Sequence, residues 1–417
     1  MEQLCCKFAL QGWDVEIVAV SLDGQIGRED RGGFVVNWLP APNRVFPGQD
    51  IPDIHYLRSP KYIADIRVVF QGLSYKPDLL IANNAQSYAA VATISKEYGV
   101  PAMGIVRDTQ MLCETGACMD NMPARQAIPC AGYVGAGRCM IRFRRVREGK
   151  SIRPWPTWFL QGMKQHWRRL GLRNAVQGFV HLVTISDSLN MLVRRTLPTY
   201  PAASIITIGN LTTMVEPARL DEVEGFIASR GLSAGRYFLF AGRKTYGKGA
   251  DLAAQAISSV RRYRTDLRLL LVGRGSMDGN FHDGVVDELS VSQSMLMSLL
   301  ENSLALVIPG RWQEGLHRTM IDALRRGIPV ICSDAGAPAV DGVIHQANGL
   351  VVPCNDSAAL AAAMLEVASW DQTRLSMCRD KGQTIFQEHF SEDMVMGRWV
   401  ELLGQVIRKK RPQHGTA

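Results

Sequence analysis

Short apolar runs alternate with helical patterns along most of this chain, as expected for parallel strands joined by crossover helices. The strands predicted in the first half are Val15–Val20, Leu79–Ala82, Ala102–Val106 and Leu182–Ile185. A helix is predicted over Tyr88–Tyr98, and Ser186 is placed to cap a second helix after the last of these strands. The first half is therefore predicted to be an α/β domain.

The second half repeats this alternation with more strongly apolar strands. The segment RYFLFAGRKTYGKGADLAAQAI predicts a strand, a loop rich in glycine and lysine, and a helix, and LRLLLVGRG adds a strand with a glycine turn. Helical pattern returns at Ser391–Lys409. A second α/β domain followed by a long helix is predicted.

The segment VIPGRWQEGLHRTMIDALRRGIPVICSDAGA carries the most informative pair of carboxylates. It predicts a strand at Leu304–Ile308, a helix from near Glu314 to about Arg326, and a strand at Pro329–Cys332. Asp322 is eight positions after Glu314, so both would lie on roughly one helix face. Glu314 would stand at the helix N-terminus, where backbone N–H groups bind phosphate. A sugar nucleotide would suit such a site, but a plain amphipathic helix explains the spacing equally well.

Two cations stand in the loop after the first apolar strand of the second half. Arg243 and Lys248 would lie at the carboxyl edge of a parallel sheet, where ligands of open α/β sheets bind. Cations there can neutralise the charge that grows on a leaving diphosphate. The alternative is an ordinary solvated loop.

In this order the motifs resemble those of the retaining glycosyltransferases of family 4, which have the two-domain GT-B fold. The resemblance covers residues 236–405 well and the first half more loosely. The matching residues are Gly242-Arg243 with Lys248-Gly249, Val272-Gly273-Arg274-Gly275, Glu314-Gly315 with Asp322-Ala323, Gly327-Ile328-Pro329-Val330, and Asn348-Gly349-Leu350 with Pro353 and Asp356.

The resemblance implies an α/β protein of two Rossmann-like, doubly wound domains that face each other across a cleft. It implies a catalytic set of Glu314, Arg243 and Lys248, in which Glu314 orients the sugar and the cations bind the diphosphate. The residues implied in donor binding are Gly242, Gly273, Gly315, Leu316, His317 and Asp322, and Asp108 is implied on the acceptor side.

Three positions depart from the family pattern. Asp322 stands where the family usually has glutamate, His317 stands where glycine is frequent, and the segment 334–339 lacks its usual glutamate. These departures leave two alternatives open beside the transferase. One is a catalytically weakened scaffold that binds a partner enzyme or a membrane, and the other is a sugar-nucleotide epimerase of the same fold.

The domain organisation follows from the same comparison. We expect an acceptor-binding domain over residues 1–208, a donor domain over 209–390, a helix over 391–410 that crosses back to the first domain, and a tail over 411–417. The first domain would include a cysteine-bearing insertion over 107–140. Because Met1 leads directly into a helical pattern where the family has a strand first, we also expect that translation begins upstream of Met1.

Composition predicts an ordinary globular protein. The 417 residues are 47% hydrophobic, and no apolar run approaches the roughly 18 residues that span a membrane. Nine cysteines without a secretory signal favour a cytoplasmic protein with reduced thiols. Four of them fall in one window and could hold a structural metal or act as a redox-sensitive staple, but could equally be unligated thiols: Cys113, Cys118, Cys130 and Cys139.

Positive charge is concentrated in residues 141–173. This basic segment has ten lysines and arginines and one glutamate, whereas the net charge of the whole chain is +8. It also carries Trp155, Trp158 and Trp167. Basic side chains interleaved with tryptophan suit an anionic membrane surface at the inner membrane face. A solvated helix that attracts an anionic donor remains the alternative, and nucleic acid is disfavoured.

None of the 23 aspartates forms a D-x-D motif, the usual carboxylate clamp for catalytic Mg²⁺ or Mn²⁺. We therefore expect a reaction that needs no metal cofactor. The predicted function is transfer of a sugar from a nucleotide-sugar donor to a glycan or lipid-linked acceptor in cell-surface polysaccharide or glycoconjugate synthesis.

Overall fold

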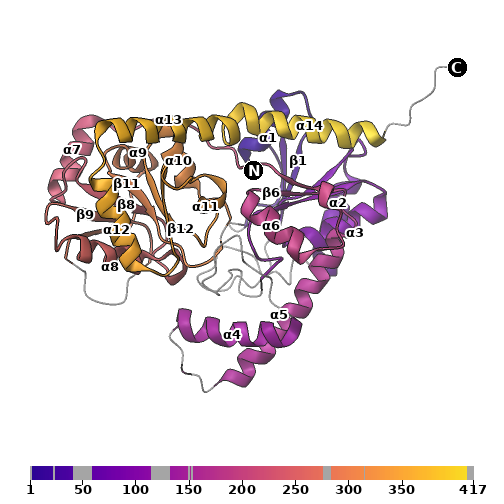
Figure 1. Cartoon of the computed structure of the whole chain (residues 1–417). Helices are drawn as coiled ribbons and strands as arrows, with labels where there is room; N and C mark the ends of the chain where they lie inside the picture. Colours follow the sequence, from indigo (N-terminus) through magenta and orange to yellow (C-terminus); the bar gives the residue numbers. More distant parts are fainter. Residues whose placement is uncertain are drawn as a thin grey trace.

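The computed structural model describes residues 2–21, 24–40, 59–113, 132–148, 151, 154–275, 283–313 and 315–410. These residues form two α/β domains with a long C-terminal helix laid across them (Figure 1).

The second domain is built on a sheet of six parallel strands. Their order is β10-β9-β8-β11-β12-β13. The bounds are β8 (Tyr237–Ala241), β9 (Arg268–Val272), β10 (Val285–Glu288), β11 (Ala305–Ile308), β12 (Val330–Ser333) and β13 (Gly349–Val352). Strand β8 shows why the runs are uniformly apolar. Tyr237 and Leu239 pack into the core on one face, and Phe238 and Phe240 pack into the core on the other.

Helices cover both faces of this sheet, since each parallel pair needs a crossover. They are α7 (Leu220–Ser229), α8 (Ala250–Val260), α9 (Gln293–Glu301), α10 (Arg318–Arg326), α11 (Pro338–Asp341), α12 (Ser357–Ala368) and α13 (Gln372–His389). A single 3₁₀ turn, η4 (Tyr246–Lys248), precedes α8. The strands and helices that the apolar pattern predicts in this half are confirmed.

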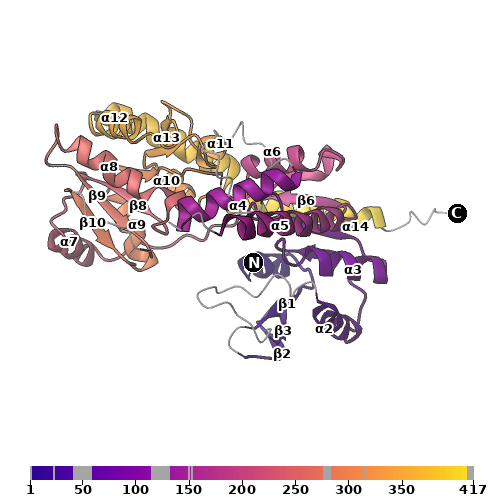
Figure 2. The ribbon, with the colours of Figure 1, turned by 90° about the horizontal axis from the view of Figure 1, so that it is seen from below.

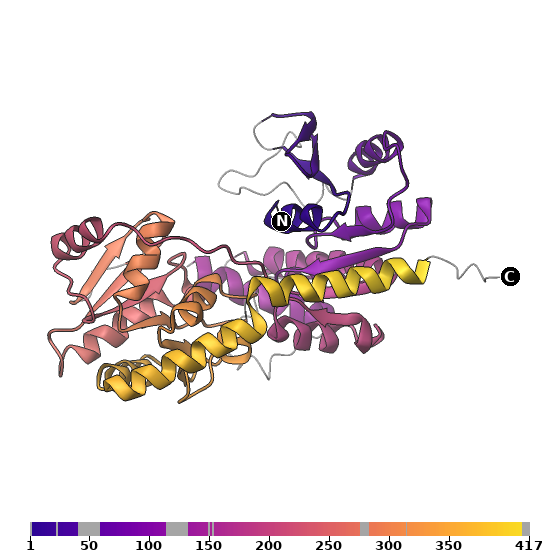
Figure 3. The same cartoon turned by 90° about the horizontal axis from the view of Figure 1, so that it is seen from above.

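The described strands of the first domain form two separate sheets. The four-stranded sheet is parallel throughout, in the order β4-β5-β6-β7, and the three-stranded sheet has the order β1-β3-β2 with β2 antiparallel. The three-stranded sheet lies beside α1, apart from the other sheet (Figure 3). The bounds are β1 (Glu16–Val20), β2 (Gly27–Asp30), β3 (Val35–Leu39), β4 (Leu80–Ala82), β5 (Ala102–Val106), β6 (His181–Thr184) and β7 (Ile205–Thr207).

Helices of the first domain pack around these sheets. Their bounds are α1 (Glu2–Leu10), α2 (Pro60–Gln71), α3 (Tyr88–Tyr98), α4 (Gly132–Glu148), α5 (Trp155–Val176), α6 (Asp187–Thr196) and the 3₁₀ turn η3 (Ala202–Ser204). Ser186 caps α6 by accepting the N–H of Leu189, as the sequence predicts.

Helices α4 and α5 form a hairpin that projects from the first domain (Figures 1 and 2). The helices cross closely because Gly162 faces α4, where a Cβ would overlap the carbonyl oxygen of Ala136. Most of the basic segment 141–173 therefore lies in this hairpin.

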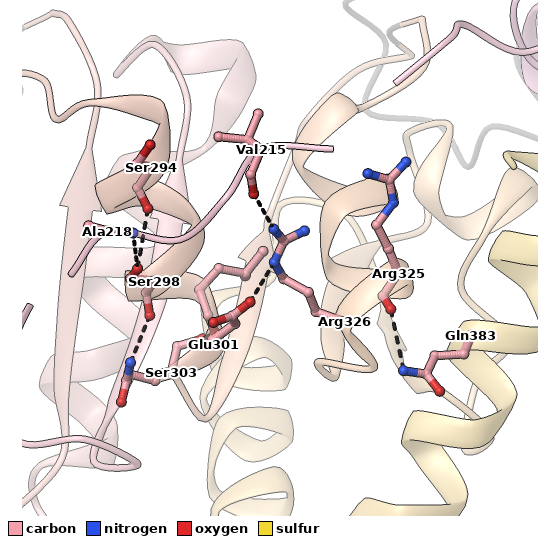
Figure 4. A network of polar contacts seen from close by, with 11 residues as sticks. Val215, Ala218, Ser294, Ser298, Glu301, Ser303, Arg325, Arg326 and Gln383 are labelled. Atoms are coloured by element: carbon pink, nitrogen blue, oxygen red, sulfur yellow. Dashed lines mark hydrogen bonds and ion pairs between the residues drawn. The ribbon is translucent and has the colours of Figure 1, made fainter. Parts of the chain in front are cut away.

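The chain passes between the domains twice. After β7 it runs along the second domain, where Arg326 of α10 donates to the carbonyl of Val215 and pairs with Glu301 (Figure 4). The return crossing leads from α13 into α14 (Glu392–Lys410), which lies against the first domain (Figures 1 and 3). Trp399 and Leu403 of α14 are buried in the first-domain core.

One predicted boundary is wrong. Helix α10 begins at Arg318, and residues 315–317 before it are not helical, with His317 in an extended conformation. Gly315 in this stretch lies against the first domain. Glu314 itself lies outside the described residues, but it is not in α10, so the argument that it shares a helix face with Asp322 fails.

Candidate functional site

The β8–α8 loop, residues 242–249, begins where two strand ends touch. The N–H of Gly242 donates to the carbonyl of Val272 at 2.9 Å. Gly273 has φ +150°, and a Cβ on it would overlap the Gly242 carbonyl oxygen. Glycine is required at 273 for both reasons, so this pair of predicted donor-binding glycines shapes the carboxyl edge of β8 and β9.

Three cations in the β8–α8 loop have different environments. Arg243 is exposed. Lys244 is buried and forms an ion pair with Asp287 of β10. Lys248 is half-buried and lines a pocket at the carboxyl ends of β8, β11 and β12. Lys244, which was not among the predicted site residues, therefore has a structural role, whereas Lys248 lines the pocket.

The opposite wall of this pocket comes from the β11–α10 loop, residues 309–317. The pocket residues contributed by this loop are Gly310, Trp312 and His317, and Ser333 and Gly336 follow β12. The pocket therefore brings Lys248 and His317, both predicted site residues, onto one surface.

His317 is neutral in this setting. Burial lowers the pKa of its imidazole to about 3, and the positive charge of Lys248 acts in the same direction. Its Nδ1 atom is buried, and no described residue offers it a hydrogen-bond partner. Because buried polar atoms are almost always paired in native proteins, a partner for this atom is expected outside the described residues.

The β11–α10 loop is anchored firmly to its own domain. The guanidinium of Arg311 binds both carboxylate oxygens of Asp251, at 2.7 and 2.6 Å, and donates to Asn355 at 2.8 Å. It also stacks over the ring of Tyr246 at 4.1 Å. A bidentate pair with these additional contacts fixes Arg311 and the residues next to it against the second domain.

The same loop makes the contacts to the first domain. The buried side chain of Gln313 donates from Nε2 to the carbonyl oxygen and the hydroxyl of Ser188, both at 2.7 Å. Gly315 lies against the carbonyl of Arg107, and Leu316 packs on the cores of both domains. One loop thus joins the pocket to the first domain.

Arg107 and Asp108 form the first-domain side of this contact. Arg107 follows β5 and donates to Asn83 at 2.7 Å and to Asn210 at 3.1 Å, which ties together the carboxyl ends of β4, β5 and β7. Asp108 accepts the N–H of Gln110 at 2.9 Å. Burial raises the pKa of the Asp108 carboxyl, and this hydrogen bond and nearby arginines oppose the rise. Asp108 therefore stands one residue from the point where the domains touch.

A second bridge joins the domains at the N-terminus of α6. The carboxylate of Asp341, in α11 of the second domain, accepts the N–H groups of Asp187 and Ser188. Burial raises the pKa of Asp341 to about 7, and the Asp187 carboxylate adds to the rise. Nothing in the sequence pattern distinguished this aspartate from other acidic residues.

The remaining predicted residues are placed as follows. Asp322 is half-buried on α10, where burial raises the pKa of its carboxyl against the effect of three arginines, and it does not line the pocket. Cys113 is buried after β5, and Cys139 is half-buried in α4. Cys118 and Cys130 lie outside the described residues. The structure therefore leaves the four-cysteine hypothesis untested.

The sequence reasoning missed Trp312, Gln313 and Asp341. The first two stand immediately before Glu314, so their place in the motif was a usable signal. Among the described residues, no three of His, Cys, Asp and Glu are grouped so as to hold a metal ion. Within the same residues, no helix has the length and apolar character needed to cross a bilayer.

The sequence also matches models of known protein families. A family model described as glycosyl transferase 4-like domain matches residues 1–210, and one described as glycosyl transferases group 1 matches residues 235–369. An exopolysaccharide phosphotransferase of Streptomyces coelicolor is 24% identical over 196 residues, which cover 45% of this chain and 20% of that protein. The match therefore spans about a fifth of that curated relative.

Solved structures share the fold at low identity. Sucrose-phosphate synthase of Thermosynechococcus elongatus has a TM-score of 0.69 at 17% identity, with 98% of this chain and 92% of that chain covered. HepE of Anabaena in complex with UDP-glucose has a TM-score of 0.61 at 14% identity, with 94% and 99% covered. The GT-B fold expected from the motifs is confirmed. Since one family model spans half of the 417 residues and a second spans much of the rest, this chain belongs to the group 1 glycosyltransferases, with a 4-like domain in its first half.

Proposed function

We propose that this protein is a retaining glycosyltransferase that moves a sugar from a nucleotide-sugar donor to a glycan or lipid-linked acceptor. The observation that carries the proposal is the β11–α10 loop. It lines the pocket that holds Lys248 and His317, and it touches the edge of the first domain that holds Asp108. The pocket has a volume of about 10 Å³, so a donor would lie over its mouth, where it would meet an acceptor bound to the first domain.

The roles follow from charge and position. Lys248 at the pocket, with Arg243 at its exposed rim, would bind the donor diphosphate and stabilise the charge on it as the sugar leaves. Neutral His317 would offer its unpaired Nδ1 to a donor hydroxyl or phosphate. Glu314, placed by the motif beside Gly315, would orient the sugar, and Asp322 would bind the ribose.

Retention would result from attack on the same face of the sugar that the diphosphate leaves. The leaving phosphate oxygen takes the proton of the acceptor hydroxyl, the new glycosidic bond forms at the anomeric carbon, and the bond to the phosphate breaks. No protein nucleophile is needed on this route. Because D-x-D is absent from the sequence, we propose that cationic side chains and backbone N–H groups replace a metal ion.

The printed names of similar proteins support the choice of first substrates. HepE has been crystallised with UDP-glucose, which makes UDP-sugars the first donors to test. The Streptomyces relative acts in exopolysaccharide chemistry according to its name, which supports a cell-surface polysaccharide as the acceptor class.

A screen of UDP-, GDP- and dTDP-sugars by thermal stabilisation tests the donor proposal, followed by assay of hydrolysis and transfer. A stabilising donor that is transferred with retention supports it. Stabilisation without hydrolysis or transfer would instead favour the weakened scaffold. Conversion of the donor to its epimer would favour the epimerase.

We further propose that the hairpin of α4 and α5 attaches the enzyme to the anionic inner membrane face, where a lipid-linked acceptor resides. On α5, Leu160, Lys164 and Trp167 follow at helical spacing and are exposed, with 64% of Leu160 and 66% of Trp167 accessible. An aromatic, an aliphatic and a cationic side chain on one face suit the interface of an anionic bilayer. Each lysine or arginine near such a surface contributes about 1 kcal/mol.

Sedimentation with anionic and neutral vesicles at low and high salt tests this attachment. Binding to anionic vesicles should weaken as salt rises, and Trp167→Ala should reduce it further. Tyr263→Ala is the matched control, because this aromatic residue is 77% exposed on the second domain. Equal sedimentation with both kinds of vesicle, or with neither, would show that the hairpin is an ordinary solvated surface.

A further inference from the structure

Helix α4 contacts the second domain through an aromatic side chain. Phe143 packs against Trp312, which is 6% exposed, and Tyr246 packs against the same indole. Figures 1 and 2 show α4 extending from α5 toward the second domain, with its C-terminal half nearer to that domain. The hairpin is thus a bridge between the domains as well as a projecting surface.

The base of the hairpin is fixed to the first domain. Leu172 and Val176 of α5 belong to the first-domain core. Arg169 donates to the carbonyl of Gln110 at 2.5 Å, and Arg173 donates to that of Leu112 at 3.0 Å. These bonds hold α5 against the segment that follows Asp108, so the first domain carries α4 through its packing on α5.

Trp312, which Phe143 contacts, is a wall of the pocket that holds Lys248 and His317. Its ring lies so close to Gly247 that a Cβ at that position would overlap the indole. Gly247 stands between Tyr246 and Lys248 in the β8–α8 loop. The contact of Phe143 with Trp312 therefore bears on both loops of the pocket, because Trp312 in turn contacts Tyr246 and Gly247 of the β8–α8 loop.

We propose that Phe143 is a positioning residue for donor binding. Through Trp312, which touches the β8–α8 loop, it holds the two loops of the donor pocket in place when the domains are closed, and so makes the hairpin a part of the donor site. The inference rests on the proposed function only in assigning this pocket to the nucleotide sugar. Phe143 itself does not line the pocket, so its effect must pass through Trp312.

Phe143→Ala tests the proposal, with Phe143→Leu as the conservative variant and Val134→Ala as the control. Val134 lies on the same helix with 56% of its surface exposed. With UDP-glucose, or the donor that the screen identifies, Phe143→Ala should raise the KM for the donor about tenfold and change kcat much less. The melting-temperature shift caused by UDP should shrink in parallel. Phe143→Leu should recover most of both, and Val134→Ala should match the wild type.

A double-mutant cycle with Trp312→Ala shows whether the effect passes through Trp312. If it does, the double variant should lose less than the product of the two single losses, because Phe143 has little left to act on. Losses that multiply, or a wild-type KM in Phe143→Ala, would overturn the inference.

Failure of the inference can be separated from failure of the proposed function. If UDP, GDP and dTDP and their sugars all fail to stabilise the wild type, the assignment of the pocket falls and the inference falls with it. If the wild type responds and Phe143→Ala responds equally, the inference alone is wrong. A lower melting temperature of Phe143→Ala without nucleotide, with an unchanged nucleotide-dependent shift, would reduce Phe143 to a packing residue and would also overturn it.

Discussion

Replacing Gly315 by alanine should hold the two domains apart. A Cβ at this position would lie 2.5 Å from the carbonyl oxygen of Arg107 and 3.3 Å from Cδ1 of Ile185. A carbon and a carbonyl oxygen in contact are normally about 3.3 Å apart or more, so the backbones must separate by roughly 0.8 Å. The oxygen belongs to the main chain and cannot rotate away. The change therefore falls on the interface between the domains.

The free energy by which closure of the domains weakens can be estimated from the hydrogen bonds beside Gly315. Gln313 donates twice to Ser188, at 2.7 Å each, and a separation of this size takes both bonds to the limit of useful geometry. Each such bond contributes about 0.5–1.5 kcal/mol net, so closure should weaken by about 1–3 kcal/mol, or between about fivefold and 150-fold. If chemistry requires the closed form, kcat/KM should fall by that factor.

Steady-state kinetics with the identified donor measure the fall, and small-angle scattering should show a more open molecule. Gly225→Ala is the control, because a Cβ at this position of α7 meets no atom within 4 Å. Its kinetics should match the wild type. The thermal midpoint of Gly315→Ala should stay near that of the control, because a shift of whole domains relieves the overlap without unpacking either core. A wild-type kcat/KM in Gly315→Ala would refute the closed arrangement as the reactive one.

Three further predictions follow from the site. Replacing Lys248 by alanine should lower kcat/KM about a hundredfold, as happens when an enzyme loses one hydrogen-bond donor to a developing anion. Arg243→Ala should also lower kcat/KM. Unchanged turnover in both variants would show that these residues do not bind the diphosphate. A chelator should leave the transfer rate unchanged, whereas loss that Mg²⁺ or Mn²⁺ restores would contradict the metal-free reaction. Burial raises the Asp341 pKa from 3.8 to about 7, so the folded state binds the proton of this carboxyl more tightly than the unfolded state does. The stability that results is fully present below about pH 4 and is lost as pH rises through about 7. The melting temperature of Asp341→Asn, which cannot ionise, should therefore rise relative to that of the wild type between about pH 4 and pH 7 and keep a constant difference above pH 7, and a pH-independent difference would disprove this.

Much of the fold was predictable because buried parallel strands leave a strong signal. The run Tyr237–Ala241 is apolar at every position because helices cover both faces of its sheet. The residues that follow such strands were predictable as a site for the same reason, since parallel strands bring their carboxyl ends to one edge. Lys248 was found in this way, and Arg243 was found beside it, although only Lys248 lines the pocket.

The contacts between the domains were not predictable from local pattern. Local pattern extended α10 back to Glu314, but α10 begins at Arg318, and Gly315 before it lies against Arg107, more than 200 positions earlier. Gln313 and Asp341 likewise have their role only through Ser188 and Asp187, and no periodicity links residues so far apart. Phe143 was part of a basic segment whose charge suggested a surface, and its contact with Trp312 depends on how the hairpin folds back.

The strengths of these contacts indicate which parts move together. Arg311 binds Asp251 with two short bonds inside the second domain, whereas the β11–α10 loop meets the first domain through the amide of Gln313 and the close approach of Gly315. The weaker set should break first, so opening would carry the loop away with the second domain and leave Ser188 behind. The two chain crossings are neighbours as well, since a Cβ on Gly209 would lie 3.5 Å from the ring of Phe390. Two adjacent crossings allow the domains to rotate about one axis, so opening and closing need not unpack either core.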